Sequence, residues 1–460
     1  MNFNKQKEEL IEFSELALKR AQDSGCEAFV NASIKNEYVT RFSNSAILQN
    51  YTDLHREIAL TVVYKDKQRA SSITNDLTKK GILNLLDYLL TAAKIVPPDP
   101  MYPGPLKEKQ QYASLVLNDP KVKNIGPDIV VDKVEEAIVA GEAVDKRIEG
   151  VSGNILLADG FNFFVSSTGQ EVLYPNTKIT STININALEK GEESRSNSTF
   201  GSRKIATLNM EKEAEETAER AIKSLGAKAI NPGDYEVILD HQAFNKLLFF
   251  IGFATSSRLV IDKYSFLTDK IGQQVFDKKL TLINDPHNPE ILSSRPVDDE
   301  GLATQPFPVV ENGVLKNYSC SRLDAARLGV KAMGACYTIF GDKLGFPFAD
   351  TVKAGTYSKD EMISEIKNGL LITNLHYVNF VNPPVGSFTG MTKDGLFIIK
   401  NGEIIGSAKN LRFTDEIPRV FKKIEIGKEL RQPIMDVYGI PSIVAPVKVK
   451  NFRFTSKTQH

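Results

Sequence analysis

The chain has 460 residues, of which 42% are hydrophobic and 25% charged, a composition typical of a globular protein long enough for two or three domains. Lys and Arg together number 57, as do Asp and Glu, so the formal net charge is zero. This balance argues against a nucleic-acid-binding protein, because such proteins usually carry a basic excess or a basic stripe.

The cysteines and the first residues bear on the cellular compartment. Cys26, Cys320 and Cys336 are far apart and form no CxxC pair, which favours reduced thiols over a disulfide framework or a zinc ribbon. The opening stretch MNFNKQKEEL is charged and lacks the apolar core of a signal peptide. No run approaches the ~18 apolar residues that a membrane span needs. We therefore expect a cytoplasmic protein without a membrane partner.

The first 96 residues predict a small α+β module. Apolar residues recur at helical spacing over residues 5–24, and Gly25 follows as a stop signal. Strands are expected over residues 27–73, in the segments EAFVNASI, YVTRFSNSAILQNY, EIALTVVYK and RASSIT, and a Leu-rich helix over residues 76–96. Closely spaced prolines in PPDPMYPGP predict a stiff linker over residues 97–110.

Residues 111–230 predict a central region of helices and a β-meander. A helix is expected near residues 131–147, and the segments ILLADG, FNFFVSS, EVLYPN and ITSTININALE are predicted as strands. The stretch RSNSTFGSR, residues 195–203, is predicted to be a polar loop. A helix over residues 210–227 and the turn Asn231-Pro232-Gly233 close the region, so we place the main domain boundary there.

Residues 231–460 predict a C-terminal, largely antiparallel β domain with flanking helices. It begins with the buried-type strand YEVILD and an apolar helix over residues 241–255. Asn312-Gly313 and Asn401-Gly402 each lie between β-prone runs, which is the strongest short signal for a hairpin. A helix carrying two arginines follows the first hairpin, and another is expected near residues 359–368. Together with the mixed helices and strands of the N-terminal domain, this predicts an α+β fold.

The last predicted strand includes KVKNFRFT, residues 448–455, in which cations alternate with aromatic residues. Such a pattern suits single-stranded nucleic acid, but it more often marks the solvent face of a terminal edge strand. We therefore predict an edge strand and no nucleic-acid partner.

Several segments of the C-terminal half occur in the order and spacing of a known family. They are YEVILD, SFLTDKIGQQVF (265–276), LINDPHNP (282–289), DDEGLATQ (298–305), NGVLKNY (312–318), the Arg-Leu-Gly that ends at Gly329, and NGEIIG with KNLRF (401–413). On these segments the chain resembles the TldD/PmbA family, once described as modulators of DNA gyrase and now regarded as metallopeptidases. The resemblance covers residues 230–455, whereas the N-terminal part agrees only in general layout.

Catalytic members of that family carry HExxxH on the helix after the YEVILD strand. Two histidines on one helical face bind zinc, and the glutamate polarises the metal-bound water. The motif follows a Leu-Leu pair, which residues 247–248 match here. Phe249 then replaces the first histidine, Phe250 the glutamate and Ala254 the second histidine, and none of them can bind zinc or act as a base. The family's third ligand is a C-terminal cysteine, and no cysteine lies beyond Cys336.

The resemblance therefore implies a PmbA-like (TldE-like) member that lacks catalytic residues, a metal or any other cofactor of its own. Such subunits pair with a TldD-type metallopeptidase that holds the zinc, and the complex is thought to cleave unfolded or leader-type peptides inside a closed cavity. We expect a non-catalytic subunit of such a complex. Two alternatives stay open: a stand-alone hydrolase with a relocated metal site, and a homodimeric peptide-binding protein without peptidase activity.

Five further residues are candidates for a cleft or an interface. His241 is either an alternative metal ligand or the first residue of an ordinary helix, and the lack of a second ligand at i+4 favours the ordinary helix. His376 is predicted to be a packed or edge histidine. Asp298, Asp299 and Glu300 suit a carboxylate metal site, an acid/base pair or a structural turn. We favour a structural or interface role for these carboxylates, while a relocated hydrolase site would use all five residues.

Overall fold

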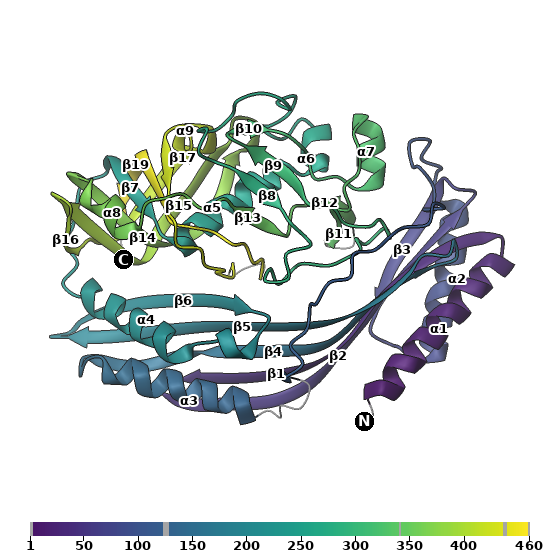
Figure 1. The fold of residues 1–460 in the computed structure, drawn as a ribbon, viewed down its shortest axis with the longest axis horizontal. Helices are drawn as coiled ribbons and strands as arrows, with labels where there is room; N and C mark the ends of the chain where they lie inside the picture. The colour runs from purple at the N-terminus through teal and green to yellow at the C-terminus, as the bar shows by residue number, and fades with distance from the viewer. Residues whose placement is uncertain (1–2, 123–127, 340–341, 436–438, 459–460) are drawn as a thin grey trace.

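The structure is a computed structural model that describes residues 3–122, 128–339, 342–435 and 439–458. Figure 1 shows a long, curled antiparallel sheet in the N-terminal half, with helices against it, and a C-terminal domain that lies over the sheet. The predicted α+β class, with an antiparallel β domain at the C-terminal end, is confirmed.

The N-terminal sheet has the strand order β3-β2-β1-β4-β5-β6. Its strands are β1 (Cys26–Ser43), β2 (Ala46–Tyr64), β3 (Gln68–Thr74), β4 (Ile148–Ser166), β5 (Glu171–Glu189) and β6 (Glu192–Ser202). Residues 29–42 of β1 pair with residues 166–153 of β4, so strands from both sides of the Pro-rich segment share this sheet. The segment divides the sequence but leaves the sheet continuous.

The strands are longer than the sequence predicted. Asn44 and Ser45, at φ 49° and 59°, form a tight turn inside a segment that was predicted as one strand, so β1 ends at Ser43 and β2 begins beyond the turn. Gly160, predicted to end a strand, lies within β4. A Cβ at this position would lie 2.0 Å from the carbonyl oxygen of Ile34 in β1, so the glycine permits close approach of two strands rather than a turn.

The prediction of a polar loop at residues 195–203 is wrong, because most of this stretch forms β6. The strand pairs with residues 179–189 of β5. Its buried Thr199 hydroxyl bonds to Gln242 Oε1 at 3.1 Å and to the carbonyl oxygen of Ile434 at 2.9 Å, both in the C-terminal half. A strand whose buried side chains are polar lacks the hydrophobic alternation by which strands are recognised.

Two pairs of helices pack on one face of the sheet. They are α1 (Phe3–Asp23) with α2 (Lys79–Ile95), and α3 (Asp128–Ala143) with α4 (Met210–Ser224), at the positions that the sequence predicts. Phe163 of β4 belongs to the core under the first pair, and Ile155 and Leu157 belong to the core under the second. Because these positions are all odd-numbered on one strand, both cores lie on the same face. The opposite face meets the C-terminal domain.

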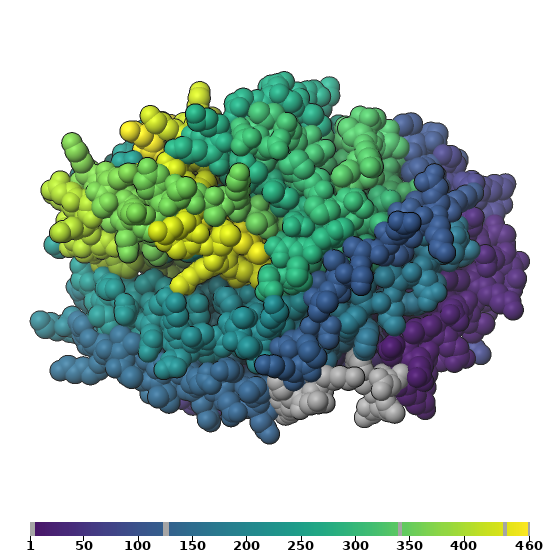
Figure 2. Space-filling view, in the orientation of Figure 1, coloured from purple at the N-terminus to yellow at the C-terminus, as the bar shows by residue number. Residues whose placement is uncertain are grey.

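The Pro-rich segment is packed against the rest of the protein. Lys67 Nζ donates hydrogen bonds to the carbonyl oxygens of Pro100 and Tyr102, at 3.1 and 2.5 Å, and the Tyr102 side chain is buried. In Figure 2 the blue stretch that includes this segment runs across the seam between the two halves of the molecule.

A closed β-barrel forms the centre of the C-terminal domain. Its strands, in order around the ring, are β14 (Asn368–Asn382), β7 (Gly233–Leu239), β19 (Val447–Lys457), β17 (Leu411–Glu416) and β15 (Ser387–Lys400), and the pairing of β14 with β15 closes it. Only the β14–β7 pairing is parallel in this ring. β16 (Glu403–Ser407) and β18 (Ile424–Ile426) pair with β15 and β19.

The prediction that residues 448–455 form an edge strand is wrong. β19 lies between β7 and β17, and Phe452 and Phe454 are buried in the barrel core. The aromatic rings of Phe452 and Phe413 lie 5.2 Å apart. Packing therefore explains the alternation in this strand: the aromatic residues face the barrel core, and the cations lie on the outside.

Smaller elements surround the barrel. They are β8 (Leu282–Asn284), β9 (Phe307–Glu311), β10 (Val314–Leu315), β11 (Cys336–Ile339), β12 (Asp342–Gly345), β13 (Asp350–Val352), α5 (His241–Ala254), α6 (Ser257–Ile261), α7 (Arg322–Leu328), α8 (Lys359–Ser364) and α9 (Ile417–Val420). Both predicted Asn-Gly hairpins are confirmed, with φ of 48° and 77° at Asn312 and Gly313 and 50° and 83° at Asn401 and Gly402. Within the described ranges, no helix is long and apolar enough to cross a membrane.

Candidate functional site around helix α5

Helix α5 lies between the barrel and the N-terminal sheet. The chain leaves β7 at Asp240, whose backbone N–H bonds to the carbonyl oxygen of Ile372 in β14, and whose side chain caps the helix by accepting a hydrogen bond from His241 N at 2.9 Å. Almost the whole helix is buried. Its first turn faces a polar pocket, and its last two turns face a group of aromatic rings.

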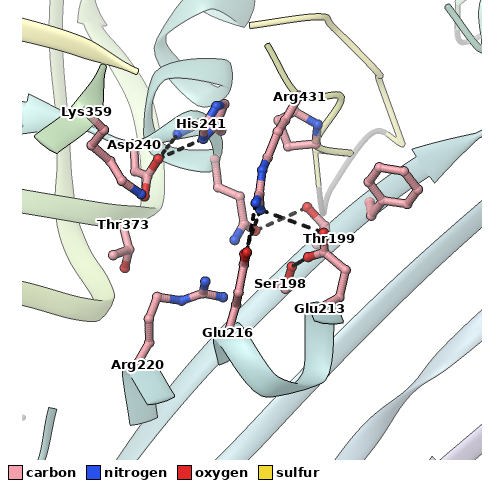
Figure 3. A pocket seen from close by; sticks show the side chains of 13 residues that line it. Ser198, Thr199, Glu213, Glu216, Arg220, Asp240, His241, Lys359, Thr373 and Arg431 are labelled. Atoms are coloured by element: carbon pink, nitrogen blue, oxygen red, sulfur yellow. Dashed lines mark hydrogen bonds and ion pairs between the residues drawn. The ribbon is translucent and has the colours of Figure 1, made fainter. Parts of the chain in front are cut away.

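The polar pocket lies where β6 and α4 of the N-terminal half meet α5 and α8 (Figure 3). Its volume of about 50 Å³ suits a few water molecules. Arg431 Nη1 and Nη2 bond to the two carboxylate oxygens of Glu216, at 2.9 and 3.0 Å, and Lys359 Nζ lies 3.0 Å from Asp240 Oδ2. The Arg431–Glu216 pair thus joins the two halves, whereas the Lys359–Asp240 pair lies within the C-terminal half.

Asp240 remains ionised in this pocket. Burial alone would raise the pKa of its carboxyl, but Lys359 and the hydrogen bonds from His241 outweigh burial and hold that pKa well below its usual range. The negative charge of Asp240 holds the side chains of Lys359 and His241 in place. Asp240 therefore connects β7, α5 and α8.

His241 has both ring nitrogens engaged. Nδ1 lies 2.7 Å from Asp240 Oδ1, and Nε2 lies 2.7 Å from the carbonyl oxygen of Glu429. A histidine ligand needs one ring nitrogen with a free lone pair, and here each nitrogen faces an acceptor within the chain. The geometry fits a helix-start residue that tethers the 429 loop.

The three positions matched to the zinc motif lie among aromatic side chains. The Phe249 ring lies 5.3 Å from that of Phe250 and 5.6 Å from that of Phe346, while Phe250 packs edge-on against Phe380 at 5.0 Å. Ala254 is 1% exposed, in the core of the C-terminal domain. Rings at these separations fill the space beside α5 with well-packed apolar surface.

A buried carboxyl lies beside the same helix and was not singled out from the sequence. A Cβ at Gly252 of α5 would lie 3.2 Å from Asp350 Oδ2. Burial raises the pKa of Asp350 well above its usual value, and Asp350 Oδ1 has no hydrogen-bond partner among the described residues. A protonated side chain is compatible with this apolar setting.

The acidic segment lies away from α5, against the N-terminal sheet. Asp298 is 1% exposed, and its Oδ1 accepts hydrogen bonds from the N–H groups of Glu300 and Leu302, at 2.9 Å each. Burial, followed by the neighbouring charge of Glu300, raises the pKa of Asp298 to about 7. Asp299 Oδ1 instead accepts a bond from Arg295 at 2.6 Å, which outweighs burial and lowers the pKa of Asp299.

This segment connects the two halves of the protein. Glu300 Oε2 accepts a hydrogen bond from the N–H of Arg322 at 2.6 Å, and so caps α7. The contacts that cross to the N-terminal half are Asn31 Nδ2 to Asp299 O, Tyr112 OH to Gly301 O, Arg322 Nη1 to Gly104 O, and Arg327 Nη2 to Asp99 Oδ2, at 2.7 to 2.9 Å. These hydrogen bonds join the acidic segment and α7 to the N-terminal half of the same chain.

The structure does not bring the five candidates into one site. His241 lies in the polar pocket, His376 lies on β14 beside Tyr377, and the acidic segment lies at the far junction with the sheet. Among the residues that the structure describes, no group of three or more His, Cys, Asp or Glu side chains is placed to hold a metal ion.

The stability of the protein is expected to fall as the pH rises from about 4 to about 7. The pKa of Asp298 is about 7 in the folded state, against an ordinary 3.8, so in this window the unfolded chain releases a proton that the folded chain retains. Stability is full below the window, and the slope inside it reaches ~1.4 kcal/mol per pH unit for one proton. Urea midpoints at several pH values measure it. Glu300→Gln removes the neighbouring charge and should reduce the slope, while burial of Asp298 and the raised pKa of Asp350 preserve part of it; an unchanged slope would refute the assignment.

Two models of one protein family match this chain. The family model described as the PmbA/TldA metallopeptidase C-terminal domain matches residues 232–456, which include the barrel, α5 and the acidic segment. The model of the central domain of the same family matches residues 120–225. The chain belongs to the PmbA/TldD metallopeptidase family.

Relatives of this PmbA/TldD-family protein align over most of its length. The metalloprotease PmbA of Escherichia coli O157:H7 is 24% identical over 425 residues, which cover 90% of each chain. A metalloprotease of Methanocaldococcus jannaschii is 25% identical over 382 residues, covering 80% of this chain and 82% of its own. The crystal structure of TldE from Thermococcus kodakarensis has the same fold, with a TM-score of 0.87 at 20% identity, covering 96% of this chain and all of that one.

Sequence reasoning missed a second cleft, between the sheet and the loops around Arg295. The signal was present in EVLYPNTK, where Tyr174, Asn176 and Lys178 alternate with other residues and so share one face of β5. The segment was predicted as a strand, but the sequence does not indicate what that face would meet.

Proposed function

We propose that this PmbA/TldD-family protein is a non-catalytic, TldE-like subunit of a peptidase complex. It would pair with a TldD-type metallopeptidase, which holds the zinc, and help to enclose unfolded or leader-type peptides while the partner cleaves them. The observation that carries this proposal is the replacement of the zinc ligands and the general base on α5 by Phe249, Phe250 and Ala254, packed among aromatic rings.

The packing around α5 supports the loss of metal chemistry at that position. A catalytic zinc site needs three protein ligands and an open position for water or substrate. Phe250 and Ala254 are 6% and 1% exposed, so little space beside them is open to solvent. Replacing one ligand would weaken a metal site, whereas an apolar core in its place gives the helix a different structural role.

The polar face of the N-terminal sheet supports a role in enclosing peptide. Its residues opposite the C-terminal domain include Asn162, Asn176 and Lys178, which line a cleft, rather than a continuous hydrophobic core. A polar wall with unused hydrogen-bonding groups can accept an extended backbone of varied sequence. The relatives named as metalloproteases agree with a peptide substrate.

The chain purified alone is expected to hold well under one zinc ion, on the order of a tenth per chain or less, because the motif positions carry no ligands. Elemental mass spectrometry measures this, with His241→Ala and His376→Ala as companions. One tightly bound metal per chain that either variant loses would overturn the proposal and favour a stand-alone hydrolase.

Mixing the chain with a TldD-type metallopeptidase from the same organism is expected to give a stable complex on size-exclusion chromatography. Separate elution of the two at micromolar concentration would count against a shared chamber. A stable dimer of this chain alone, together with that result, would favour a homodimeric peptide-binding protein.

A further inference from the structure

The second cleft lies between the polar face of the sheet and the C-terminal domain, and its volume is about 250 Å³. It is lined by Asn162, Tyr174, Asn176 and Lys178 from β4 and β5, and by Leu292, Ser293, Ser294, Arg295, Tyr337, Phe348, Gly439, Ile440 and Pro441. Among these described lining residues none is Asp or Glu, whereas two are cations. Arg295 is paired with Asp299, so Lys178 is the cation of the cleft that has no carboxylate partner among the described residues.

Two hydrogen-bond donors of the lining residues are buried without a partner. Asn162 Nδ2 and Arg295 Nε have no acceptor among the described residues. The other nitrogens of Arg295 bond to Asp299 Oδ1 at 2.6 Å and to the carbonyl oxygen of Cys336 at 2.5 Å, and its guanidinium lies 3.7 Å from the centre of the Tyr337 ring. Unmet buried donors are costly, so an acceptor from outside the chain would stabilise them.

Lys178 adds a positive charge that no carboxylate of the described residues contacts as an ion pair. Burial lowers its pKa, and the positive charges of Lys35 and Arg203 lower it further, while Glu37 acts in the opposite sense. Glu37 thus offsets only part of the effect that Lys35 and Arg203 have on Lys178. A bound anion would relieve it.

Arg203 also fixes how Asn176 presents its side chain. The Arg203 guanidinium donates to Asn176 Oδ1 and to the carbonyl oxygens of Leu117, Thr177, Pro289 and Ile291, and it contacts no carboxylate among the described residues. Because Asn176 Oδ1 is occupied, the Nδ2 group of this lining residue is the part left for a ligand. Asn176 Nδ2 is thus a further donor of the cleft, and the buried positive charge of Arg203 lies next to Asn176.

We propose that this cleft binds a carboxylate group of a peptide, with Asn162, Asn176 and the Arg295 Nε as its donors and Lys178, four residues farther along β5 than the partner of Asn162, as an additional positive charge. The inference rests on the proposed peptide-handling function and names the chemical class that the chain would recognise. Charge-assisted hydrogen bonds from several donors to one carboxylate are among the strongest polar contacts in proteins. The carboxylate comes either from the peptide C-terminus or from an Asp or Glu side chain.

Aromatic residues at the cleft suit an apolar side chain next to that carboxylate. The Tyr337 and Phe348 rings lie 4.2 Å apart, and Phe348 packs on Phe346 at 4.6 Å, which in turn contacts Phe249 of α5. The volume is below the ~300–1,000 Å³ of sites for drug-sized ligands, so it fits one or two peptide residues. The cleft adjoins the aromatic group that occupies the position of the family's metal motif.

Fluorescence anisotropy tests the proposal with three N-terminally fluorescein-labelled peptides of the sequence Gly-Ser-Ala-Gly-Ser-Ala-Gly-Ser-Ala-Phe and the full-length protein in complex with its TldD-type partner. The partner carries an inactivating change of its motif glutamate. One peptide has a free C-terminal carboxylate, one is amidated, and one is amidated with an internal Ser changed to Asp. We expect a carboxylate-bearing peptide to bind at least roughly tenfold more tightly than the plain amide.

Lys178→Gln and Asn162→Ala should each reduce this preference toward one, while Lys190→Gln, at an exposed turn between β5 and β6, should leave it unchanged. Tighter binding of the free acid alone assigns the site to the C-terminus, and tighter binding of the Asp peptide assigns it to side chains. Equal binding of all three peptides, or a preference that survives both cleft variants, overturns the carboxylate site and leaves the peptide-handling function standing. Failure of every peptide to bind overturns both.

Discussion

Cleavage of an unfolded peptide by the reconstituted complex is expected to fall by roughly 100-fold to 10,000-fold when the HExxxH glutamate of the TldD-type partner is replaced by glutamine, since this removes the general base. The same measurement with His241→Ala in this chain should stay within about twofold of the unmodified complex. The physical reason is that both ring nitrogens of His241 are engaged within the chain, by Asp240 and by the carbonyl oxygen of Glu429. Initial rates at saturating peptide give the comparison.

The two variants control for each other, because each changes one side chain in one subunit. Size-exclusion chromatography should show that both variants still assemble. A loss of orders of magnitude with His241→Ala, in a complex that remains intact, would mean that this chain takes part in the chemistry and that the register of the zinc motif on α5 was assigned wrongly.

Replacement of Arg203 by alanine is expected to lower the free energy of unfolding by about 3–5 kcal/mol, a loss that would unfold many proteins at 37 °C. Arg203 is 2% exposed, and its guanidinium satisfies carbonyl oxygens of both the N-terminal half and the 289–291 loop. Truncation leaves those oxygens buried without a donor and opens a cavity. The midpoint of urea unfolding, followed by circular dichroism, measures the change.

Arg195→Ala is the matched control, because Arg195 lies on β6, the strand that Arg203 directly follows, and is exposed, with one hydrogen bond to Asn184. Its effect should stay within about 0.5 kcal/mol. Similar midpoints for the two alanine variants would show that the Arg203 network contributes little and that the interface between the halves rests on apolar contacts.

Local signals in the sequence predicted much of the fold. The helices over α1, α2, α3 and α4 follow from apolar periodicity, and both Asn-Gly hairpins follow from the need for positive φ. These features depend on residues close together in the chain. The barrel, in contrast, depends on the pairing of β7 with β14 and β19, which lie more than 100 residues away in the chain, and no local signal in β7 specifies those partners.

The wrong predictions share one physical cause, which is that the environment of a strand is set by its neighbours. β6 was taken for a loop because Ser, Thr and Asn dominate it, yet it pairs with β5 along its length. Residues 448–455 were taken for an edge because their cations alternate with aromatics, yet strands flank them on both sides. Composition reports polarity, whereas pairing decides position in a sheet.

The candidate site, like the fold, could be predicted from the sequence only in part. The proposed replacement of the zinc motif rests on the resemblance of the sequence to a family, and it could be proposed from the sequence because the motif lies within one helix. The cleft that joins Asn162 and Lys178 to Arg295 could not, since its walls come from two strands of the sheet and from loops of the other half. Such a site exists only after the halves have packed together.

The two partner strands of β1 are synthesised at very different times during translation. β2 follows it at once through the Asn44-Ser45 turn, but the partner on its other side, residues 153–166, is synthesised only after two further helices and the Pro-rich segment. At ~5–20 residues per second, that edge stays open for on the order of ten seconds. Nascent chains on neighbouring ribosomes could pair through such an open edge. The pairing of β4 with β1 therefore closes an edge at which nascent chains could otherwise associate.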